Sequence, residues 1–442
     1  MLTRREFINT AAAATAAVLT PGRLLAALEK QTAPLPDLSQ WSTVRAQFAL
    51  TKEYLHFASF YIVSHPKPVR DAIEDFRRVL DAEPVLTVEH RMFQQADNIQ
   101  YKIRDDMAGY LGARRDELAI TSNTTTGLAL VYHGLPLSPS DEILTTTHDH
   151  YSHHESIRLA AAKAGATVRR VPLFEKSSIA TTDEMTGRLR SAFRPNTRVV
   201  GLTWVHSSTG MRLPIPALAA VVREANRNRS EKDQILLVVD GVHGLGAVDE
   251  TVAELGADFF CAGTHKWMFA PRGTGIVWGK AGQWAKLRPT IPTFADMGAF
   301  MAWMNGDTTP RPTTAYDMTP GGFHAYEHQW AMSAAFRFHE KIGRARVAKR
   351  IRDLNDQCKA GLAAMKNVTL HTPRDPALSA GMVCFEVAGV SPEDTVKRLL
   401  ERKIIASTTP YKPTYARLAP SLVNTPEEVD VVLKAVRQIA GA

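Results

Sequence analysis

Two charged residues stand at the ends of two apolar segments in the middle of the chain. Asp240 ends the run QILLVVD at residues 234–240, and Lys266 follows the run ADFFCAG at residues 257–263. Each run has the length and composition of a buried strand. Open α/β sheets bind ligands at the carboxyl ends of their strands, so we expect both side chains at one sheet edge. A lysine in such a place must be solvated, paired or used chemically.

An aldehyde cofactor would use both residues. The amine of Lys266 can form an imine, or Schiff base, with pyridoxal 5'-phosphate (PLP). Asp240 can keep the pyridine nitrogen protonated, so that the ring accepts electrons from the substrate Cα. The alternative is a surface lysine and an unrelated aspartate. We predict a PLP enzyme that acts on an amino acid or a small amine.

Both residues belong to longer motifs: DGVHG at residues 240–244, THK at 264–266 and RGTG at 272–275. Together these motifs resemble the class V aminotransferase family of fold-type I PLP enzymes, and within it the isopenicillin N epimerase-like proteins. The resemblance runs from about residue 53 to the C-terminus. It implies an α/β fold, with a large domain built on a mostly parallel seven-stranded sheet flanked by helices, a smaller C-terminal α/β domain, and a homodimer.

The resemblance also implies how the cofactor is held. The loop SNTTTG at residues 122–127 resembles the phosphate loop, and backbone N–H groups at a helix start suit an anion, although a simple helix cap is the other interpretation. His150 matches the ring that stacks on the cofactor, with Tyr151 as the alternative. Ser207 and His243 match contacts to the phenolic oxygen, and His265 matches a phosphate contact. The predicted cofactor-binding residues are Asn123, Thr124, Thr125, His150, Tyr151, Ser207, Asp240, His243, His265 and Lys266.

Three of these residues, Lys266, Asp240 and His150, are the predicted catalytic residues. Arg417 resembles the family's arginine for the substrate carboxylate, because a guanidinium grips a carboxylate through two parallel hydrogen bonds. The alternative is an ordinary surface arginine. The histidines near His150 lack metal-ligand spacing, so we expect no metal.

Two departures from the family limit what the resemblance implies. Cysteine desulfurases carry a reactive cysteine in the loop before this arginine, whereas residues 407–415 read STTPYKPTY, so persulfide chemistry is not expected. Many members also take a phosphate-binding threonine from the partner subunit. The corresponding segment, residues 319–326, aligns ambiguously, although Gly321 and Gly322 could supply backbone donors.

Once substrate is bound, Lys266 is expected to remove the Cα proton as general base. Transamination, epimerisation and loss of a β or γ group all start in this way, and we place transamination slightly ahead of epimerisation. A PLP-fold protein that binds a ligand without turnover is a further alternative. A nucleotide-binding Rossmann protein is disfavoured, because no G-x-G-x-x-G follows the first strand.

From residue 114 onward, apolar β-rich runs alternate with helical stretches. This alternation predicts the strands and helices of an α/β domain that hold the site residues. We expect an N-terminal segment, residues 31–60, that packs on the small domain, a large PLP-binding domain at 61–327, and a small domain at 328–442. The last helix should begin at Thr425, a good N-cap followed by proline and acids.

The first thirty residues resemble a twin-arginine (Tat) export signal, with Arg4 and Arg5 before an alanine-rich apolar run. An alanine-rich helix of the mature protein is the alternative. We predict a periplasmic or otherwise exported protein that uses the Tat machinery, a route that carries folded, cofactor-loaded proteins. The net charge of +8 is dispersed along the chain, so nucleic acid is not an expected partner. No membrane insertion is expected after processing.

Overall fold

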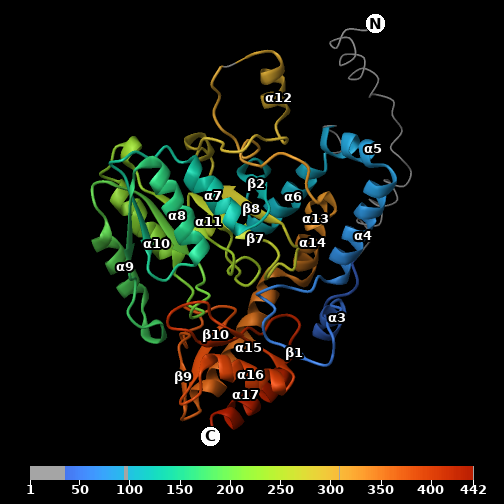
Figure 1. The fold of residues 1–442 in the computed structure, drawn as a ribbon, viewed down its shortest axis with the longest axis vertical. Coiled ribbons are helices and arrows are strands. Elements are labelled where there is room, and N and C mark those ends of the chain that lie inside the picture. The colour runs from blue at the N-terminus through green and yellow to red at the C-terminus, as the bar shows by residue number, and fades with distance from the viewer. Residues whose placement is uncertain (1–34, 94–97, 308, 442) are drawn as a thin grey trace.

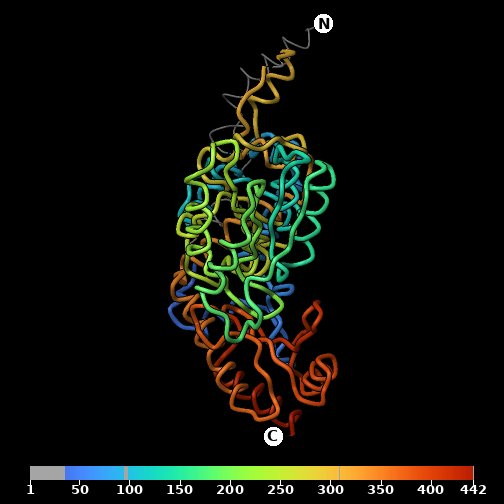
Figure 2. The backbone as a smooth tube through the Cα atoms, turned by 90° about the vertical axis from the view of Figure 1, so that its left-hand side faces the viewer, coloured from blue at the N-terminus to red at the C-terminus, as the bar shows by residue number. Residues whose placement is uncertain are grey.

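The computed structural model describes residues 35–93, 98–307 and 309–441, so the predicted Tat signal lies outside the described residues. A large α/β domain occupies the centre of the molecule, and a smaller domain, which ends at the C-terminus, lies below it in Figure 1. The side view in Figure 2 shows the same two parts along the long axis, with one narrow extension at the opposite end.

A seven-stranded sheet forms the centre of the large domain. Its strands lie in the order β2, β8, β7, β6, β5, β3, β4. They are β2 (Leu118–Thr121), β3 (Glu142–Thr146), β4 (Thr167–Val171), β5 (Thr197–Thr203), β6 (Leu236–Asp240), β7 (Phe259–Gly263) and β8 (Gly275–Gly279). The five strands from β7 to β4 are parallel, whereas β8 runs antiparallel to both β7 and β2. The predicted mostly parallel seven-stranded sheet is confirmed.

Helices flank this sheet, and their starts follow local capping rules. Asn123 and His150 cap the two helices that begin at the carboxyl edge, α7 and α8. The helices of the large domain are α4 (Lys67–Ala82), α5 (Pro84–Val88), α6 (Ile99–Leu111), α7 (Thr124–Gly134), α8 (Tyr151–Ala164), α9 (Thr182–Ala192), α10 (Ile215–Asn226) and α11 (Val252–Leu255). A short helix, α12 (Met297–Met304), sits on the extension at the top of Figures 1 and 2.

The long helical pattern near residue 340 divides into three helices: α13 (Tyr326–Trp330), α14 (Met332–Ile342) and α15 (Arg344–Ala363). Gly343 separates α14 from α15 with a φ of +97°, a conformation that suits glycine. Helices α13 and α14 pack on α4 and α6, whereas α15 packs on the last helix of the chain. The chain therefore passes from the large apolar core to the small one along α15.

The small domain has an antiparallel sheet in the order β12, β13, β10, β9. These strands are β9 (Val368–Leu370), β10 (Val383–Val387), β12 (Ser407–Thr408) and β13 (Ala416–Leu418). Helices α15 and α16 (Pro392–Glu401) pack on this sheet, and α17 (Pro426–Ile439) packs on both helices. Thr425 caps α17 through a capping box with Glu428, as predicted.

Residues before the first αβ repeat contact this small domain. Strand β1 (Leu55–His56) pairs in parallel with β11 (Ile404–Ile405). From α3 (Trp41–Ala46), Arg45 donates a hydrogen bond to the carbonyl of Val423 (2.9 Å) and forms an ion pair with Glu428. The predicted domain boundaries stay a prediction.

Candidate active site

Adjacent parallel strands deliver the two residues on which the sequence prediction rests. Asp240 is the last residue of β6, and Lys266 follows the end of β7. Asp240 has only 1% of its surface exposed, and its Oδ1 accepts a hydrogen bond from the N–H of Val242 (3.1 Å). A Cβ on Gly241 would lie 1.9 Å from the ring of Phe260, so only glycine lets the chain turn directly after the aspartate.

The Lys266 amine lies 3.2 Å from Nε2 of His243. Burial lowers the pKa of Lys266 to about 8, with Asp240 opposing the shift and Arg417 adding to it. Burial also raises the pKa of Asp240 to about 6. Both groups are thus displaced toward their neutral forms, as desolvation requires, and such displaced pairs are typical of reactive sites.

The start of α7 is the candidate anion-binding end of the site. Asn123 Oδ1 accepts a hydrogen bond from the N–H of Thr126 (2.9 Å), and Thr124 Oγ1 accepts one from the N–H of Gly263 (2.7 Å), which ties α7 to β7. The Thr124 hydroxyl is therefore engaged in the fold, whereas Thr125 is exposed beside it.

The ring of His265 lies against this helix start, because a Cβ on Gly263 would meet both His265 Cε1 (2.7 Å) and Thr124 Oγ1 (3.1 Å). Nδ1 of His265 is buried and bonds to no atom of the described residues. A buried polar atom without a partner is costly unless a ligand satisfies it. The helix start, the hydroxyls and this ring nitrogen together fit the phosphate of PLP.

His150 caps α8, and its Nδ1 accepts a hydrogen bond from the N–H of Ser152 (3.2 Å). Burial lowers the pKa of His150 to about 4, helped by the charges of Lys266 and Arg417, so the ring is neutral at physiological pH. Tyr151, the alternative stacking residue, is 73% exposed. This contrast favours His150 as the residue that faces the cofactor.

Asp149 fixes the turn that presents His150. One carboxylate oxygen accepts hydrogen bonds from the Thr145 hydroxyl (2.7 Å) and the Thr146 N–H (2.8 Å), and the other accepts one from the N–H of Thr203 (2.8 Å). It thus joins the ends of β3 and β5. Sequence reasoning assigned Asp149 no role, because its role depends on contacts between strands that are distant in the sequence.

Arg417 lies on β13, buried beside Ser207. Its Nη1 donates to the carbonyl of Ser207 (2.6 Å), its Nε to the hydroxyl of Ser407 (3.1 Å) and its Nη2 to the carbonyl of Thr408 (3.2 Å). The guanidinium carbon stands 4.3 Å from the ring centre of Phe60. A guanidinium has five N–H groups, so two of them are left for a carboxylate.

Tyr411 is a site residue that sequence reasoning missed. Its hydroxyl lies 2.7 Å from the Ser207 hydroxyl, and its ring meets that of His150 edge-on, with 6.1 Å between centroids. Burial raises the pKa of Tyr411 to about 12, so the phenol keeps its proton. The only signal in the sequence was its place in the loop before Arg417.

Thr319, in the segment considered for a cross-subunit phosphate contact, is engaged inside its own subunit. It has 2% of its surface exposed, and its hydroxyl accepts hydrogen bonds from Arg104 (2.8 Å) and from the N–H of Ile120 (3.2 Å). This hydroxyl is therefore not free to reach another chain.

The histidines around His150 have protein partners of their own. His153 Nε2 lies 2.7 Å from the Tyr132 hydroxyl, His154 Nε2 lies 2.8 Å from the carbonyl of Thr146, and His148 stacks on Phe174. Among the described residues, no group of three His, Cys, Asp or Glu side chains is arranged to hold a metal ion.

The residues present fit PLP at each of its polar groups. The phosphate fits the α7 start and His265, the pyridine nitrogen fits Asp240, and the aldehyde carbon fits Lys266. His243 and Ser207 are the predicted contacts to the phenolic oxygen. These residue roles stay predictions, while the structure brings the residues together from β6, β7, α7, α8 and β13.

The chain is similar to known proteins in its family profile, in its sequence and in its fold. The profile of the family described as Aminotransferase class-V matches residues 64–412. Isopenicillin N epimerase of Streptomyces clavuligerus is 26% identical over 414 residues, which cover 91% of this chain and 99% of the relative. A probable cysteine desulfurase of Pyrococcus abyssi is 25% identical over 82% of this chain and 86% of its own.

Two solved structures have a similar fold. A C-DES mutant with glycine covalently linked to its PLP cofactor superposes with a TM-score of 0.76 at 22% identity, over 89% of this chain and 98% of the other. The apo cysteine desulfurase of Thermococcus onnurineus NA1 also has a TM-score of 0.76, at 21% identity, over 93% and 100% of the two chains. At these identities the likeness establishes the fold, with its large and small α/β domains.

Proposed function

Because this chain belongs to the aminotransferase class-V family, whose cofactor is PLP, we propose that it acts at the Cα of an amino acid or small amine through Lys266. Transamination is the leading reaction and epimerisation the second. The alternatives are elimination of a β or γ group and a non-catalytic PLP-fold binding protein.

The observation that carries the proposal is the meeting of Asp240 and Lys266 at the carboxyl edge of two adjacent buried strands, with the lysine pKa lowered to about 8. Bound PLP supplies an electron sink for the bond broken at Cα. Asp240 holds the proton at the pyridine nitrogen, Arg417 orients the substrate carboxylate, and Lys266 Nζ takes the Cα proton.

The first test is an absorption spectrum of purified protein beside Lys266→Ala, before and after borohydride. We expect a visible band in the wild type that borohydride bleaches, leaving the cofactor covalently attached only when Lys266 is present. A wild type that shows no band and gains none on adding PLP would contradict the proposal.

The two leading reactions differ in what they require of the protein. Transamination needs only Lys266, which can return the proton to the cofactor. Epimerisation needs a second donor that reaches Cα from the other side. Tyr411 favours this second candidate, because its protonated hydroxyl lies 2.7 Å from that of Ser207, its ring meets the His150 ring edge-on, and it belongs to a different segment from Lys266.

The reactions can be separated in deuterium oxide with single enantiomers of several amino acids. Transamination gives a keto acid, epimerisation gives the other enantiomer with deuterium at Cα, and elimination releases the side-chain group. If the wild type epimerises, Tyr411→Phe should abolish inversion while exchange with retention continues. A wild type with neither keto acid nor Cα exchange would instead indicate a binding protein.

Sulfur transfer through a protein persulfide is not proposed, although some relatives are named cysteine desulfurases. Residues 407–415 contain no cysteine, and the three cysteines of the chain are all buried. Cys384 lies opposite Arg417 in the sheet register, but burial raises the pKa of its thiol to about 12. A thiol with so high a pKa is a poor nucleophile.

We also propose a homodimer whose subunits meet through α12. This helix has no buried residue and no charged one, and Trp303 is 74% exposed at its end. A projecting apolar helix of this kind is typical of an interface. Light scattering should show a dimer that Met301→Glu/Trp303→Glu converts to monomer. Val431→Glu, an equivalent change on exposed α17, should stay dimeric; an unchanged dimer in the double variant would contradict the proposal.

Export through the Tat pathway is proposed from Arg4 and Arg5 and the apolar run after them. The wild type should appear, cofactor-loaded, in the periplasmic fraction of a bacterial host. Arg4→Lys/Arg5→Lys should stay in the cytoplasm, because Tat recognition requires the arginine pair. Export of the double variant at the wild-type level would overturn this proposal.

A further inference from the structure

Three side chains next to the site form a short hydrogen-bonded series. The indole Nε1 of Trp267 lies 3.3 Å from Nδ1 of His243, and Nε2 of the same histidine lies 3.2 Å from the Lys266 amine. Trp267 and His243 are both buried. The histidine ring thus separates the indole from the amine and contacts each with one nitrogen.

The direction of these hydrogen bonds follows from the chemistry of the groups. An indole N–H only donates, so Nδ1 of His243 must accept. Burial lowers the pKa of His243 well below its ordinary value, with Lys266 and Arg417 adding to the shift, so the ring is neutral and carries one hydrogen. That hydrogen is then on Nε2, which points at the amine. An ammonium group has no lone pair, so only a neutral amine can accept this hydrogen bond.

The opposite tautomer would reverse the effect on the lysine. If Nδ1 carried the hydrogen, Nε2 would be an acceptor and would stabilise the ammonium form of Lys266. The Trp267 N–H excludes this arrangement, because two donors would then face each other. The choice between a neutral and a charged lysine is therefore coupled to a residue that does not touch the amine.

Packing holds the indole in place. It stacks on Phe60, with 6.3 Å between centroids and 23° between the ring planes. A Cβ on Gly381, whose φ is +70°, would lie 2.6 Å from the indole ring, and one on Gly246 would lie 2.7 Å from the Trp267 carbonyl carbon. The ring therefore has little room to turn away from His243.

Other charged groups also face the amine. Asp240 at the end of β6 favours the ammonium form, and Arg417 on β13 opposes it. The neutral rings of His150 and His265 border the same space. None of these groups depends on the indole N–H, so their influence should remain when Trp267 is replaced.

We propose that Trp267 is a positioning residue that sets the tautomer of His243 and thereby keeps Lys266 as a neutral amine ready to capture the cofactor aldehyde. In that capture the bond from Nζ to the aldehyde carbon forms, and the two amine hydrogens leave with the carbonyl oxygen as one water molecule. No oxidant or reductant is needed. The inference rests on the proposed anchoring role of Lys266.

The test uses the full-length apoprotein, without PLP or substrate, so its outcome is independent of catalysis. Acetylation of Lys266 by trace acetic anhydride is followed against pH by mass spectrometry. We expect a wild-type midpoint near pH 8 and a midpoint about 0.5 to 1 unit higher in Trp267→Phe, which corresponds to roughly three- to tenfold slower labelling at pH 7. The matched control is Trp330→Phe, because the buried Nε1 of Trp330 has no partner in the described structure.

An unchanged midpoint in folded Trp267→Phe, or an equal shift in Trp330→Phe, would overturn the proposal. If Trp267→Phe fails to fold, the wild type still decides the question. In apoprotein labelled with ¹⁵N-histidine, the ring nitrogen shifts of His243 should report the hydrogen on Nε2. A hydrogen on Nδ1 would refute the proposal. Failure of the PLP spectrum with a confirmed tautomer would instead refute only the proposed function.

Discussion

The carboxyl edge and the amino edge of the large sheet each bury a carboxylate, but the pKa values of the two carboxylates shift in opposite directions. Asp240 ends β6 at the carboxyl edge, and Glu142 begins β3 at the amino edge; each has only 1% of its surface exposed. Burial raises the pKa of Asp240 to about 6. Burial would also raise the pKa of Glu142, but hydrogen bonds from Arg169 and Thr197 lower it below its ordinary value.

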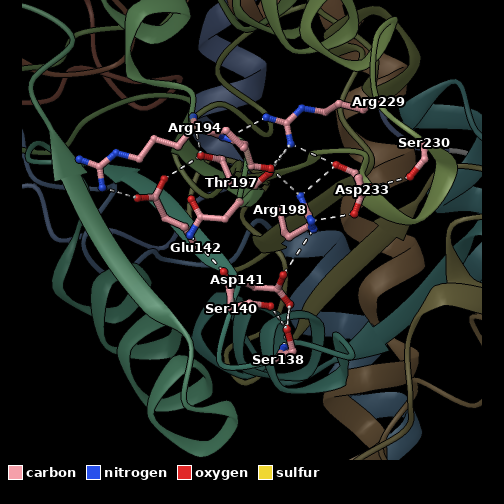
Figure 3. A network of polar contacts seen from close by, with 12 residues as sticks. Ser138, Ser140, Asp141, Glu142, Arg194, Thr197, Arg198, Arg229, Ser230 and Asp233 are labelled. Atoms are coloured by element: carbon pink, nitrogen blue, oxygen red, sulfur yellow. Dashed lines mark hydrogen bonds and ion pairs between the residues drawn. The ribbon is translucent and has the colours of Figure 1, made fainter.

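At the amino edge, both carboxylate oxygens of Glu142 accept hydrogen bonds from neighbouring side chains. Arg169 binds both carboxylate oxygens of Glu142 at 2.8 Å, and the Thr197 hydroxyl and Arg194 add further hydrogen bonds at 2.7 and 3.2 Å. Arg229 links this network to Asp233, because its Nη1 donates to the carbonyls of Thr197 (2.9 Å) and Asp233 (3.2 Å), and Arg198 in turn binds the Asp233 carboxylate (2.7 Å), as Figure 3 shows.

At the carboxyl edge, by contrast, His265 Nδ1 is buried without a partner in the described chain, and Lys266 and Asp240 are displaced toward their neutral forms. Burial to the same depth therefore gives a stabilising ion pair at Glu142, where every oxygen lone pair has a donor. It gives reactive groups at the carboxyl edge, where hydrogen-bond partners are missing. The partners that are missing at the carboxyl edge are those that the proposed cofactor and substrate contacts would supply.

The largest expected effect is at the carboxyl edge. Lys266→Ala should lower turnover by at least about 10³-fold, because the general base is lost, while the thermal midpoint of the apoprotein changes by less than about 2 °C. Steady-state rates and calorimetry measure the two quantities. A large loss of thermal stability would show that the carboxyl edge stabilises the fold as the amino edge does.

Arg417→Lys should raise KM roughly 10- to 100-fold and lower kcat less, since one ammonium cannot replace two parallel N–H donors. Initial rates over a range of substrate concentrations give both constants. Arg198→Lys, the same change at the amino edge, should leave KM unaltered. An equal rise in KM in both variants would contradict the assignment of Arg417 to the substrate.

At the amino edge, Glu142→Gln should lower the free energy of unfolding by about 2 kcal/mol at pH 7, with kcat unchanged. Because the pKa of Glu142 is lower in the folded protein, its contribution is present above the unfolded value near 4.5 and disappears as pH falls through the folded value. The difference between variant and wild type should therefore shrink below about pH 4.

Urea unfolding at several pH values measures this effect. Glu155→Gln on α8 is the matched control, because Glu155 pairs with Arg158 at the exposed surface. Glu155→Gln should cost much less free energy of unfolding than Glu142→Gln, because solvent screens an exposed ion pair. A difference for Glu142→Gln that is as large at pH 3 as at pH 7 would mean that the stabilisation does not come from the ionised carboxylate.

The smallest effect is expected for Asp233→Asn, at the exposed end of the amino-edge network. The Arg198–Asp233 pair is partly solvated, so its loss should cost less free energy of unfolding than Glu142→Gln, and high salt should reduce the difference further. Thermal unfolding at low and high salt measures this. A salt-independent loss of stability as large as that of Glu142→Gln would mean that solvent does not screen the Arg198–Asp233 pair.

Much of this fold was predictable because its signals are local. The apolar runs of β3, β5, β6 and β7 are buried on both faces, so their composition alone indicated strands of a parallel sheet. By contrast, β13 has three residues and no pattern of its own, so it was missed although it carries Arg417. It forms only because β10 and β12 pair with it.

The amino-acid order indicates which groups are available for chemistry: a lysine and an aspartate at strand ends, a helix start for an anion, and an arginine near the C-terminus. The folded chain is needed to see that Tyr411 joins them, that Trp267 bonds His243, and that the pKa values of Asp240 and Glu142 shift in opposite directions. Backbone propensities and apolar patterns act over neighbouring residues, whereas pKa values and tautomers depend on partners that distant segments bring into contact.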